Sequence, residues 1–503
     1  MQNYDPKLLP ASFVPFTASS AFKEKQRVLI PEKAKSQTVV FLSSIKALFD
    51  TLKITDGMTL SFHHHLRNGD YVFNMVMEEI KKRNLKNMHL APSAIFPNNQ
   101  VLSELIENGN VTDITTNYLN GPVAETIGKG LMKGLLIMDT HGGRARAIES
   151  GDLKIDVAIL SVPAVDLKGN GNVIEGPSAC GSLGYAISDL KYAKKVVLVT
   201  DSIIDSLKRV DLPCEYVDYV VKLDKIGDPK GIVSGTTKIT KDPIGLKIAR
   251  NTAKLLDELD FIKDGMSMQT GAGGTSLAVA QYVKEKMQDK HIKGSFASGG
   301  ITGYIVDMLN EGLFEKLYDV QCFDLQAVES IKNNPAHLPM SASVYANPYD
   351  PEVIVDKLDF VILGATEIDT NFNVNVTTDS KGLIIGGSGG HSDTAYGAKV
   401  TIITSALLKS RLSIVKDKVT TVTTPGEDVD ILVTERGIAV NPKRTNLLEK
   451  LAGSKLPLVP IEKLLETSQR IAGTPKRIEL KDKVIGLVRY RDGSIIDLLY
   501  QYK

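Results

Sequence analysis

The chain has 503 residues, 43% of them hydrophobic and 24% charged, with 60 basic residues against 59 acidic ones. This length is too great for one hydrophobic core and predicts roughly two to four domains. The balanced charge excludes recognition of nucleic acid or an anionic membrane through overall charge, so a partner must be recognised locally. The three cysteines lack C-x-x-C spacing, which indicates neither a disulfide framework nor a zinc site and favours a cytoplasmic location.

The predicted elements follow an N-terminal arm, residues 1–45, whose scattered prolines show neither helical nor strand periodicity. Short apolar runs then alternate with amphipathic stretches, which predicts strands alternating with helices and a mostly parallel open sheet. Strands are expected at 58–62, 87–92, 134–140, 157–162, 195–200 and 265–270, and helices at 71–83, 244–259 and 276–287. A turn-rich segment, 227–237, is the predicted linker between a first α/β domain, 46–235, and a second, 236–503. The second domain ends in a predicted hairpin around Asp492 and Gly493, and neither a signal peptide nor a membrane span is indicated.

The two predicted domains repeat one another in sequence. Ser, Asp, Tyr, Lys and Val of residues 188–196 recur in register at 392–400, a spacing of 392 − 188 = 204. Residues 156–173 are echoed by 359–376, at 359 − 156 = 203, and residues 56–60 by 264–268, at 264 − 56 = 208. Three segments in the same order at nearly constant spacing predict a tandem duplication, with a ligand cleft between two similar halves.

Candidate binding residues lie in loops that follow the predicted strands, because ligands of open α/β sheets bind beyond the carboxyl ends of the strands. Two loops belong to the first half and two to the second. The first-half candidates are His63, His64, His65, Arg67 and Asn68 in one loop and His141, Arg144 and Arg146 in the other. The second-half candidates are Gly271, Gly273 and Gly274 in one loop and Gly386, Gly387, Gly389, Gly390 and His391 in the other.

The chemistry of these loops favours an anionic ligand. Arginine and histidine donors suit carboxylates, and glycine loops let a narrow ligand approach the backbone. A metal is not expected, because only His63 and His65 have usable spacing and no acidic cluster accompanies them. The Gly271 loop matches neither G-x-G-x-x-G nor the P-loop pattern, which disfavours nucleotides. Structural roles for the histidines, a solvated turn at Arg144 and Arg146, and a flexible turn at 386–390 remain alternatives.

At these residues the chain resembles the coenzyme A transferases, a family of duplicated α/β domains. The resemblance rests on residues 271–276, 368–375, 386–390 and 433–439. Within that group, the segments 63–70, 141–152, 176–185 and 490–497 resemble the citrate lyase α chains over nearly the whole length. The resemblance implies a transferase that exchanges acetate for citrate on a thioester in citrate fermentation. The acyl group would be carried by an acyl carrier protein, with acetyl-CoA also accepted.

The resemblance also implies how the reaction proceeds. Many coenzyme A transferases hold a nucleophilic glutamate where this chain has residues 293–300, which include no carboxylate. A ternary complex with a mixed anhydride is therefore expected, without a covalent enzyme intermediate and without a cofactor bound to the chain. In this scheme the histidine and arginine loops bind citrate, and the 386–391 loop binds the pantetheine arm of the thioester. The expected oxyanion donors are Gly271, Gly273, Gly274, Ser298 and Gly299.

The expected partners are citrate, the acyl carrier protein, the citryl lyase subunit and a further copy of the chain. Neither nucleic acid nor a membrane is expected. Alternative hypotheses are a carboxylate-binding scaffold with a decayed site, a coenzyme A transferase for another acid, and a sugar-phosphate isomerase or deaminase. The doubled length argues against the isomerase or deaminase. If the cleft hypothesis holds, the four loops converge on one boundary between the domains.

Overall fold

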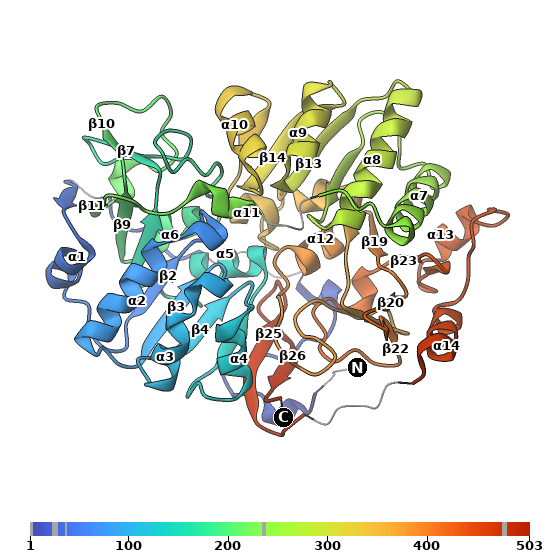
Figure 1. Ribbon diagram of the computed structural model, residues 1–503, viewed down its shortest axis with the longest axis horizontal. Coiled ribbons are helices and arrows are strands. Elements are labelled where there is room, and N and C mark those ends of the chain that lie inside the picture. Colours follow the sequence, from blue (N-terminus) through green and yellow to red (C-terminus); the bar gives the residue numbers. More distant parts are fainter. Residues whose placement is uncertain (1–3, 23–28, 36–37, 234–237, 475–479, 503) are drawn as a thin grey trace.

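The computed structural model describes residues 4–22, 29–35, 38–233, 238–474 and 480–502. Two α/β lobes lie side by side, the first mainly in blue to green and the second from yellow-green to red-orange (Figure 1). Each lobe is built on one large, mostly parallel sheet flanked by helices. The predicted fold class of two α/β domains is therefore confirmed.

The first sheet has ten strands in the order β1-β11-β9-β6-β2-β3-β4-β5-β25-β26. Its bounds, in that order, are Val40–Leu42, Tyr219–Lys222, Lys195–Thr200, Val157–Ser161, Thr59–Phe62, Met88–Pro92, Val111–Thr116, Leu136–Met138, Val484–Arg489 and Ile495–Tyr500. The central strand β6 is buried at all five positions. Burial on both faces explains its uninterrupted apolar run, as in other parallel sheets.

The second sheet has eight strands in the order β15-β14-β13-β12-β16-β19-β23-β24. Its bounds are His337–Pro339, Phe314–Cys322, Gly294–Ile301, Ser267–Thr270, Phe360–Leu363, Val400–Thr404, Ile431–Thr434 and Gly437–Val440. Strands β5-β4-β3-β2-β6-β9-β11 of the first sheet correspond in order to β15-β14-β13-β12-β16-β19-β23 of the second. The repeat seen in the sequence is therefore a repeat of strand order.

Short sheets and helices complete each lobe. The short strands are β10 (Ile203–Ile204), β7 (Ala164–Asp166), β8 (Gly171–Asn172), β18 (Val374–Asn375), β17 (Glu367–Asp369), β22 (Val415–Lys416), β20 (Leu408–Lys409) and β21 (Leu412–Ser413). The first-lobe helices are α1 (Ile45–Leu52), α2 (Val72–Arg83), α3 (Val101–Glu107), α4 (Pro122–Gly128), α5 (His141–Glu149) and α6 (Ala186–Tyr192). The second-lobe helices are α7 (Pro243–Glu258), α8 (Gly274–Asp289), α9 (Gly303–Asn310), α10 (Leu325–Asn333), α11 (Ala342–Ala346), α12 (His391–Gly397), α13 (Thr445–Lys450) and α14 (Ile461–Ala472). No helix within the described ranges is long and apolar enough to cross a membrane.

The start of α7 shows how local sequence fixes an element. Asp242 is its N-cap, and the Asp242 carboxylate accepts a hydrogen bond from Gly245 N at 3.1 Å. Pro243 occupies the first helical position, where its missing N–H costs nothing. The second domain therefore begins with a well-defined helix directly after the linker segment, of which residues 234–237 lie outside the described part of the chain.

The C-terminal hairpin corrects the predicted domain boundaries. Strands β25 and β26 form the expected antiparallel hairpin, but β25 pairs in parallel with β5, with Leu487 beside Ile137. The hairpin therefore completes the first sheet, and its assignment to the second domain is wrong. Strand β1 also joins this sheet, so the predicted arm ends a few residues earlier than 45. Order along the chain does not reveal which sheet edge a final strand covers, although an uncovered edge such as that of β5 favours pairing.

Candidate functional site

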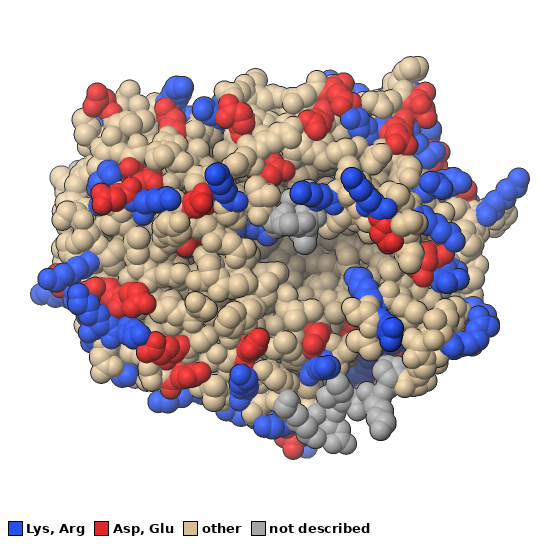
Figure 2. Space-filling model, viewed as in Figure 1, with Lys and Arg blue, Asp and Glu red and all other residues tan. Residues whose placement is uncertain are grey.

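The two lobes touch through loops that follow strands of each sheet. Gln321 Nε2, in the second lobe, donates to His64 O in the first at 2.9 Å. His141 N donates to Gly389 O at 2.8 Å, and Gly389 N donates to Asn117 O at 3.2 Å. Figure 2 shows the surface hollowed near its middle, along the boundary between the lobes. The junction site, as we call it, comprises His64, Arg67, His141, Tyr185 and Gly389.

Strand β12, which precedes the Gly271 loop, is linked to the Gly386–Gly390 loop through Tyr345 of α11. Gln269, two residues before Gly271, donates Nε2 to Tyr345 Oη at 2.8 Å. A Cβ atom on Gly390 would lie only 2.5 Å from the same Tyr345 oxygen. The Gly386–Gly390 loop therefore meets the His141 segment at the boundary, whereas convergence of the Gly271 loop with the histidine loops stays a prediction.

An aromatic stack forms the first-lobe wall of the junction site. The Tyr185 ring lies 4.8 Å from the His64 ring and 4.5 Å from the His141 ring, measured between centroids. Burial lowers the pKa of His64 well below its usual value, and burial together with the Arg144 charge lowers the pKa of His141 to about 3. Both rings are therefore neutral near pH 7. Because His64 Nδ1 bonds Ser93 Oγ at 2.6 Å and His141 Nδ1 accepts from Asn117 Nδ2 at 3.2 Å, Nε2 is the atom of each ring left to meet a ligand.

Arg67 is the cation of the junction site. Its guanidinium lies 4.8 Å from the Phe323 ring centroid and 5.6 Å from that of Phe96. Within the described ranges no carboxylate lies within ion-pair distance of Arg67, and Arg67 Nε is buried without a hydrogen-bond partner. Its backbone φ of +53° is rare for a residue other than glycine, and such strain clusters at functional sites. A half-buried, unpaired guanidinium is suited to an anionic ligand.

The structure removes Arg144 and Arg146 from the predicted citrate-binding set. The segment is helix α5 rather than a loop, and Arg144 is only 2% exposed. Its guanidinium donates to Asp189, Ser61 Oγ at 2.7 Å and the carbonyl of Ala91 at 2.9 Å. Arg146 Nη1 pairs with Asp152 at 2.6 Å. Adjacent arginines can look solvent-exposed in sequence, but here their positions on a buried helix make them structural.

We expect Arg144→Ala to destabilise the protein without changing citrate affinity. The substitution leaves Asp189, which is 0% exposed, as an uncompensated buried charge. Breaking such a pair costs about 3–5 kcal/mol of unfolding free energy. Urea unfolding would measure this loss, and calorimetry at a temperature where the variant is folded would measure citrate binding. If the variant instead kept its stability and lost citrate affinity, the result would show that Arg144 binds citrate.

Only one of the three consecutive histidines lies at the boundary. His63 and His65 are 5% and 2% exposed, with ring centroids 5.4 Å apart. His63 Nε2 donates to Ser161 O at 3.0 Å, so the ring is already engaged within the first lobe. Both ring nitrogens of His65 lack a hydrogen-bond partner, but the side chain is buried away from the boundary residues. Asn68 is exposed, and it stays an untested candidate.

The Gly386–Gly390 loop is glycine-rich for reasons within the protein. A Cβ atom on Gly386 would lie 2.5 Å from Val376 O, and one on Gly387 would lie 2.3 Å from Asn117 O. His391 is buried, with Nε2 donating to Gly364 O at 2.9 Å and Nδ1 bonded to Thr424 Oγ1 at 2.7 Å. In place of the expected pantetheine contacts, Gly386 and His391 pack within the second lobe, and Gly387 packs against the first lobe. Gly389 and Gly390 are half-buried at the boundary and stay candidates.

The predicted oxyanion donors divide into open and covered positions. Gly273 is exposed and a Cβ there would meet no atom within 4 Å, whereas Ser298 and Gly299 are buried against Gln269. Helix α8 begins at Gly274 without a side-chain cap, so its first N–H groups are free to bind an anion. Gly271 N already donates to Ile362 O at 2.9 Å, so Gly273 and Gly274 are the better placed of the predicted oxyanion donors.

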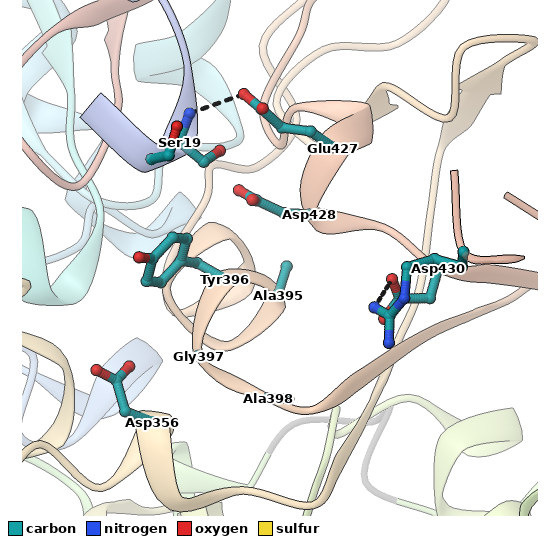
Figure 3. Close-up of a pocket in the computed structure, with 11 residues that line it drawn as sticks. Ser19, Asp356, Ala395, Tyr396, Gly397, Ala398, Glu427, Asp428 and Asp430 are labelled. Atoms are coloured by element: carbon teal, nitrogen blue, oxygen red, sulfur yellow. Dashed lines mark hydrogen bonds and ion pairs between the residues drawn. The ribbon is translucent and has the colours of Figure 1, made fainter. Parts of the chain in front are cut away.

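A separate pocket of about 480 Å³ lies on the second lobe, near the end of α12 (Figure 3). Asp356, Glu427, Asp428 and Asp430 line it, and Arg444 is already paired with Asp430. Burial raises the pKa of Asp428 to about 7, which leaves the other acids to set a negative potential. Such a pocket repels a polycarboxylate, so we do not assign the site here. No group of three or more side chains in the described ranges could hold a metal ion.

Sequence reasoning missed Tyr185 and Tyr345. The repeat itself carries a signal for Tyr185, because 389 − 185 = 204 is the spacing that relates Ser188 to Ser392. Tyr185 therefore occupies the position in the first repeat that Gly389 occupies in the second. Comparing the repeats would have placed Tyr185 beside the glycine loop.

The two repeated α/β sheets and the loops that meet between them define the duplicated architecture of the coenzyme A transferase class. The family model described as "Citrate lyase, alpha subunit (CitF)" matches residues 39–502. The chain therefore belongs to the citrate lyase α-subunit family.

Individual relatives agree over nearly the whole chain. The citrate lyase α chain of Haemophilus influenzae is 48% identical over 451 residues, which cover 90% of each chain. A crystal structure of a Streptococcus mutans citrate lyase α subunit in complex with citrate matches with a TM-score of 0.94 and 43% identity, covering 100% of this chain and 99% of that one. A Pseudomonas malonate decarboxylase hetero-tetramer, 15% identical with a TM-score of 0.64 over 86% of this chain and 87% of that one, shares the fold.

Proposed function

We propose that this chain exchanges acetate for citrate on a carrier-bound thioester, acting as the transferase subunit of a citrate lyase complex. Membership of the citrate lyase α-subunit family supports this activity, and the S. mutans relative is described in complex with citrate. The observation that carries the proposal is Arg67, an unpaired guanidinium at the boundary between the lobes. A cation without a partner in the protein is suited to a substrate carboxylate.

The proposed reaction balances in two acyl transfers. A citrate carboxylate oxygen attacks the carbonyl carbon of the acetyl thioester and the C–S bond breaks. This step forms a citryl–acetyl anhydride and releases the carrier as a thiolate. The thiolate then attacks the citryl carbonyl of the anhydride, and acetate leaves. No group on the protein changes its covalent state, so catalysis consists of positioning and of stabilising two successive oxyanions.

The junction site and the Gly271 loop divide these tasks. Citrate carries about three negative charges near neutral pH, and Arg67 supplies the full positive charge that faces them. Neutral His64 and His141 add hydrogen-bond donors without repelling Arg67. The amides at the start of α8, with Gly273, are the proposed donors to the thioester oxyanion, because Gly271 N already donates to Ile362 O at 2.9 Å.

The proposed partners are an acyl carrier protein bearing a phosphopantetheine thioester, a citryl lyase subunit, and further copies of the chain. No cofactor bound to this chain is part of the proposal, because both transfers use substrate atoms alone. A cytoplasmic location and a role in citrate fermentation stay predictions.

The activity can be tested by mixing purified protein with acetyl-CoA and citrate and measuring acetate. We expect acetate release that depends on citrate, accompanied by formation of citryl-CoA. Acetate released equally without citrate would indicate a thioesterase, and release with another acid but not with citrate would indicate a different coenzyme A transferase. No release with either acetyl-CoA or an acetylated carrier protein would favour a binding scaffold.

We predict that no covalent acyl-enzyme or thioester adduct forms. Residues 293–300 are Lys293 and all of β13 except its last residue, Ile301, and they contain no carboxylate. The nearest alternatives in sequence are engaged elsewhere. Glu329 is exposed on α10 and hydrogen-bonds Asn333, while Glu435 accepts a bond from Leu407 N at 2.9 Å.

Intact-mass measurement after incubation with acetyl-CoA and a hydroxylamine quench should therefore show the unmodified chain. Initial-rate kinetics should give intersecting double-reciprocal lines rather than the parallel lines of a ping-pong scheme. A mass increase localised to a glutamate would disprove the anhydride route and leave the transferase activity standing.

A further inference from the structure

The two repeats differ at one buried charge. In the first repeat, the N-cap residue of α5 is Thr140, and four residues later Arg144 pairs with Asp189 of α6 at 3.1 Å. In the second repeat, the N-cap residue of α11 is Ser341, and the residue four positions later is Tyr345. The carboxylate equivalent to Asp189 is Asp393, since 393 − 189 = 204. Asp393 therefore has a tyrosine where its counterpart has an arginine.

The C-terminal hairpin supplies the missing cation. Arg491, in the turn between β25 and β26, is 0% exposed and places Nε 3.3 Å from Asp393 Oδ1. Its Nη2 donates to Ala346 O at 3.0 Å, and its guanidinium lies 4.9 Å from the Tyr396 ring centroid. The two strands of the hairpin thus complete the first sheet, while Arg491 in its turn supplies the cation of a buried ion pair in the second lobe.

Asp393 in turn holds the start of α5. Its Oδ1 accepts from Thr140 Oγ1 at 2.9 Å and its Oδ2 accepts from Gly142 N at 3.0 Å. Helix α5 also lies unusually close to α11, because a Cβ on Gly142 would be 1.9 Å from Ala346 O. Between Thr140 and Gly142 stands His141, whose own N–H bonds the Gly389 carbonyl at 2.8 Å. The Asp393 contacts therefore fix the residue that joins the two sides of the junction site.

We propose that Arg491 and Asp393 are positioning residues for the transfer reaction, setting the place of His141 relative to the Gly389 turn. The inference rests on the proposed function for its activity readout. A buried ion pair contributes little net stability after desolvation, but Arg491 holds Asp393 in place, and the hydrogen bonds that Asp393 accepts from Thr140 and Gly142 fix geometry. Misplacing a substrate-positioning group by about 1 Å costs up to about 10²-fold in rate. The pair should therefore affect turnover more than it affects folding.

Arg491→Lys tests the proposal, because it keeps the charge and removes the planar fork. We expect the kcat for citrate-dependent acetate release to fall on the order of tenfold or more, with a small change in citrate KM. We also expect the amides of His141 and Gly142 to exchange hydrogen on the order of tenfold faster. Arg444→Lys is the matched control, because Arg444 pairs with buried Asp430 in the second lobe and lies outside the junction site.

Three outcomes would overturn the proposal. The first is a folded Arg491→Lys protein with normal kcat and normal exchange. The second is an equal loss in Arg491→Lys and Arg444→Lys, which would indicate general destabilisation. If Arg491→Lys fails to fold, the double variant Asp393→Asn with Arg491→Met, which removes both charges, is tested in its place. The third outcome that would overturn the proposal is full kcat in this double variant. A wild-type protein that releases no acetate would refute the proposed function, while the exchange comparison would still decide the positioning role.

Discussion

Replacing Arg67 by alanine should remove most of the citrate-dependent acetate release while leaving the protein folded. Arg67 makes no ion pair with the described residues, so its loss leaves no unpaired carboxylate behind. A charge-assisted hydrogen bond to citrate contributes about 1.5–3 kcal/mol, which corresponds to about 10- to 150-fold in kcat/KM. Steady-state kinetics with varied citrate, together with calorimetric citrate titration, would measure both effects.

Arg83 offers a matched control for this experiment. Its guanidinium also lies over an aromatic ring, 5.3 Å from the Phe49 centroid, but it pairs with Glu79 and Asp50 near the surface. Arg83→Ala should therefore leave citrate affinity unchanged. Arg67→Lys should recover part of the binding, because the charge remains while the bidentate geometry is lost. If the citrate KM of Arg67→Ala equals that of the wild type, Arg67 does not bind citrate and another residue must bind the anion.

The fold was largely predictable because its strands are short, apolar and repeated. Runs such as 157–162 and 195–200 became the central strands β6 and β9, and the spacing near 204 became a repeated strand order. The hairpin was placed in the wrong domain because periodicity identifies strands and not their partners. Strand β25 contacts β5 across more than 300 positions of sequence, a pairing that no local pattern encodes.

The site was predictable in position and not in the identity of each contact. Loops after parallel strands were expected to converge, and His64, His141 and Gly389 do meet. Whether the other candidate side chains are available to a ligand depends on their burial. His63 and Arg144 have the donors that citrate needs, yet both turn into the first lobe and bond partners there. A donor's availability depends on which neighbours it already satisfies, and sequence alone gives no list of neighbours.

Glycines can be sorted in the same physical way. Among described glycines with no atom within 4 Å of a Cβ position, those at 57, 265, 312, 453 and 473 have positive φ and are explained by their turns. Gly273 has φ of −72°, which any residue adopts, and it shares with Gly364 free space around the Cβ position without a positive φ. Within the described protein, neither strain nor crowding requires glycine at this position. A ligand that approaches the backbone closely would supply the reason.

Gly273→Val should therefore damage turnover far more than stability. As an N-cap change from glycine it should cost about 1 kcal/mol of unfolding free energy or less. If the thioester carbonyl binds the first amides of α8, the added side chain displaces it, and the loss of that oxyanion contact should lower kcat by about 10²-fold. Citrate affinity, set by the junction site, should remain close to wild type.

Gly387→Ala is the contrasting case, because its Cβ would lie 2.3 Å from Asn117 O and should destabilise the contact between the lobes. Full turnover in a folded Gly273→Val protein would show that the thioester does not pass this loop, and an oxyanion donor would then have to be sought at Gly390 in the neighbouring loop of the same lobe.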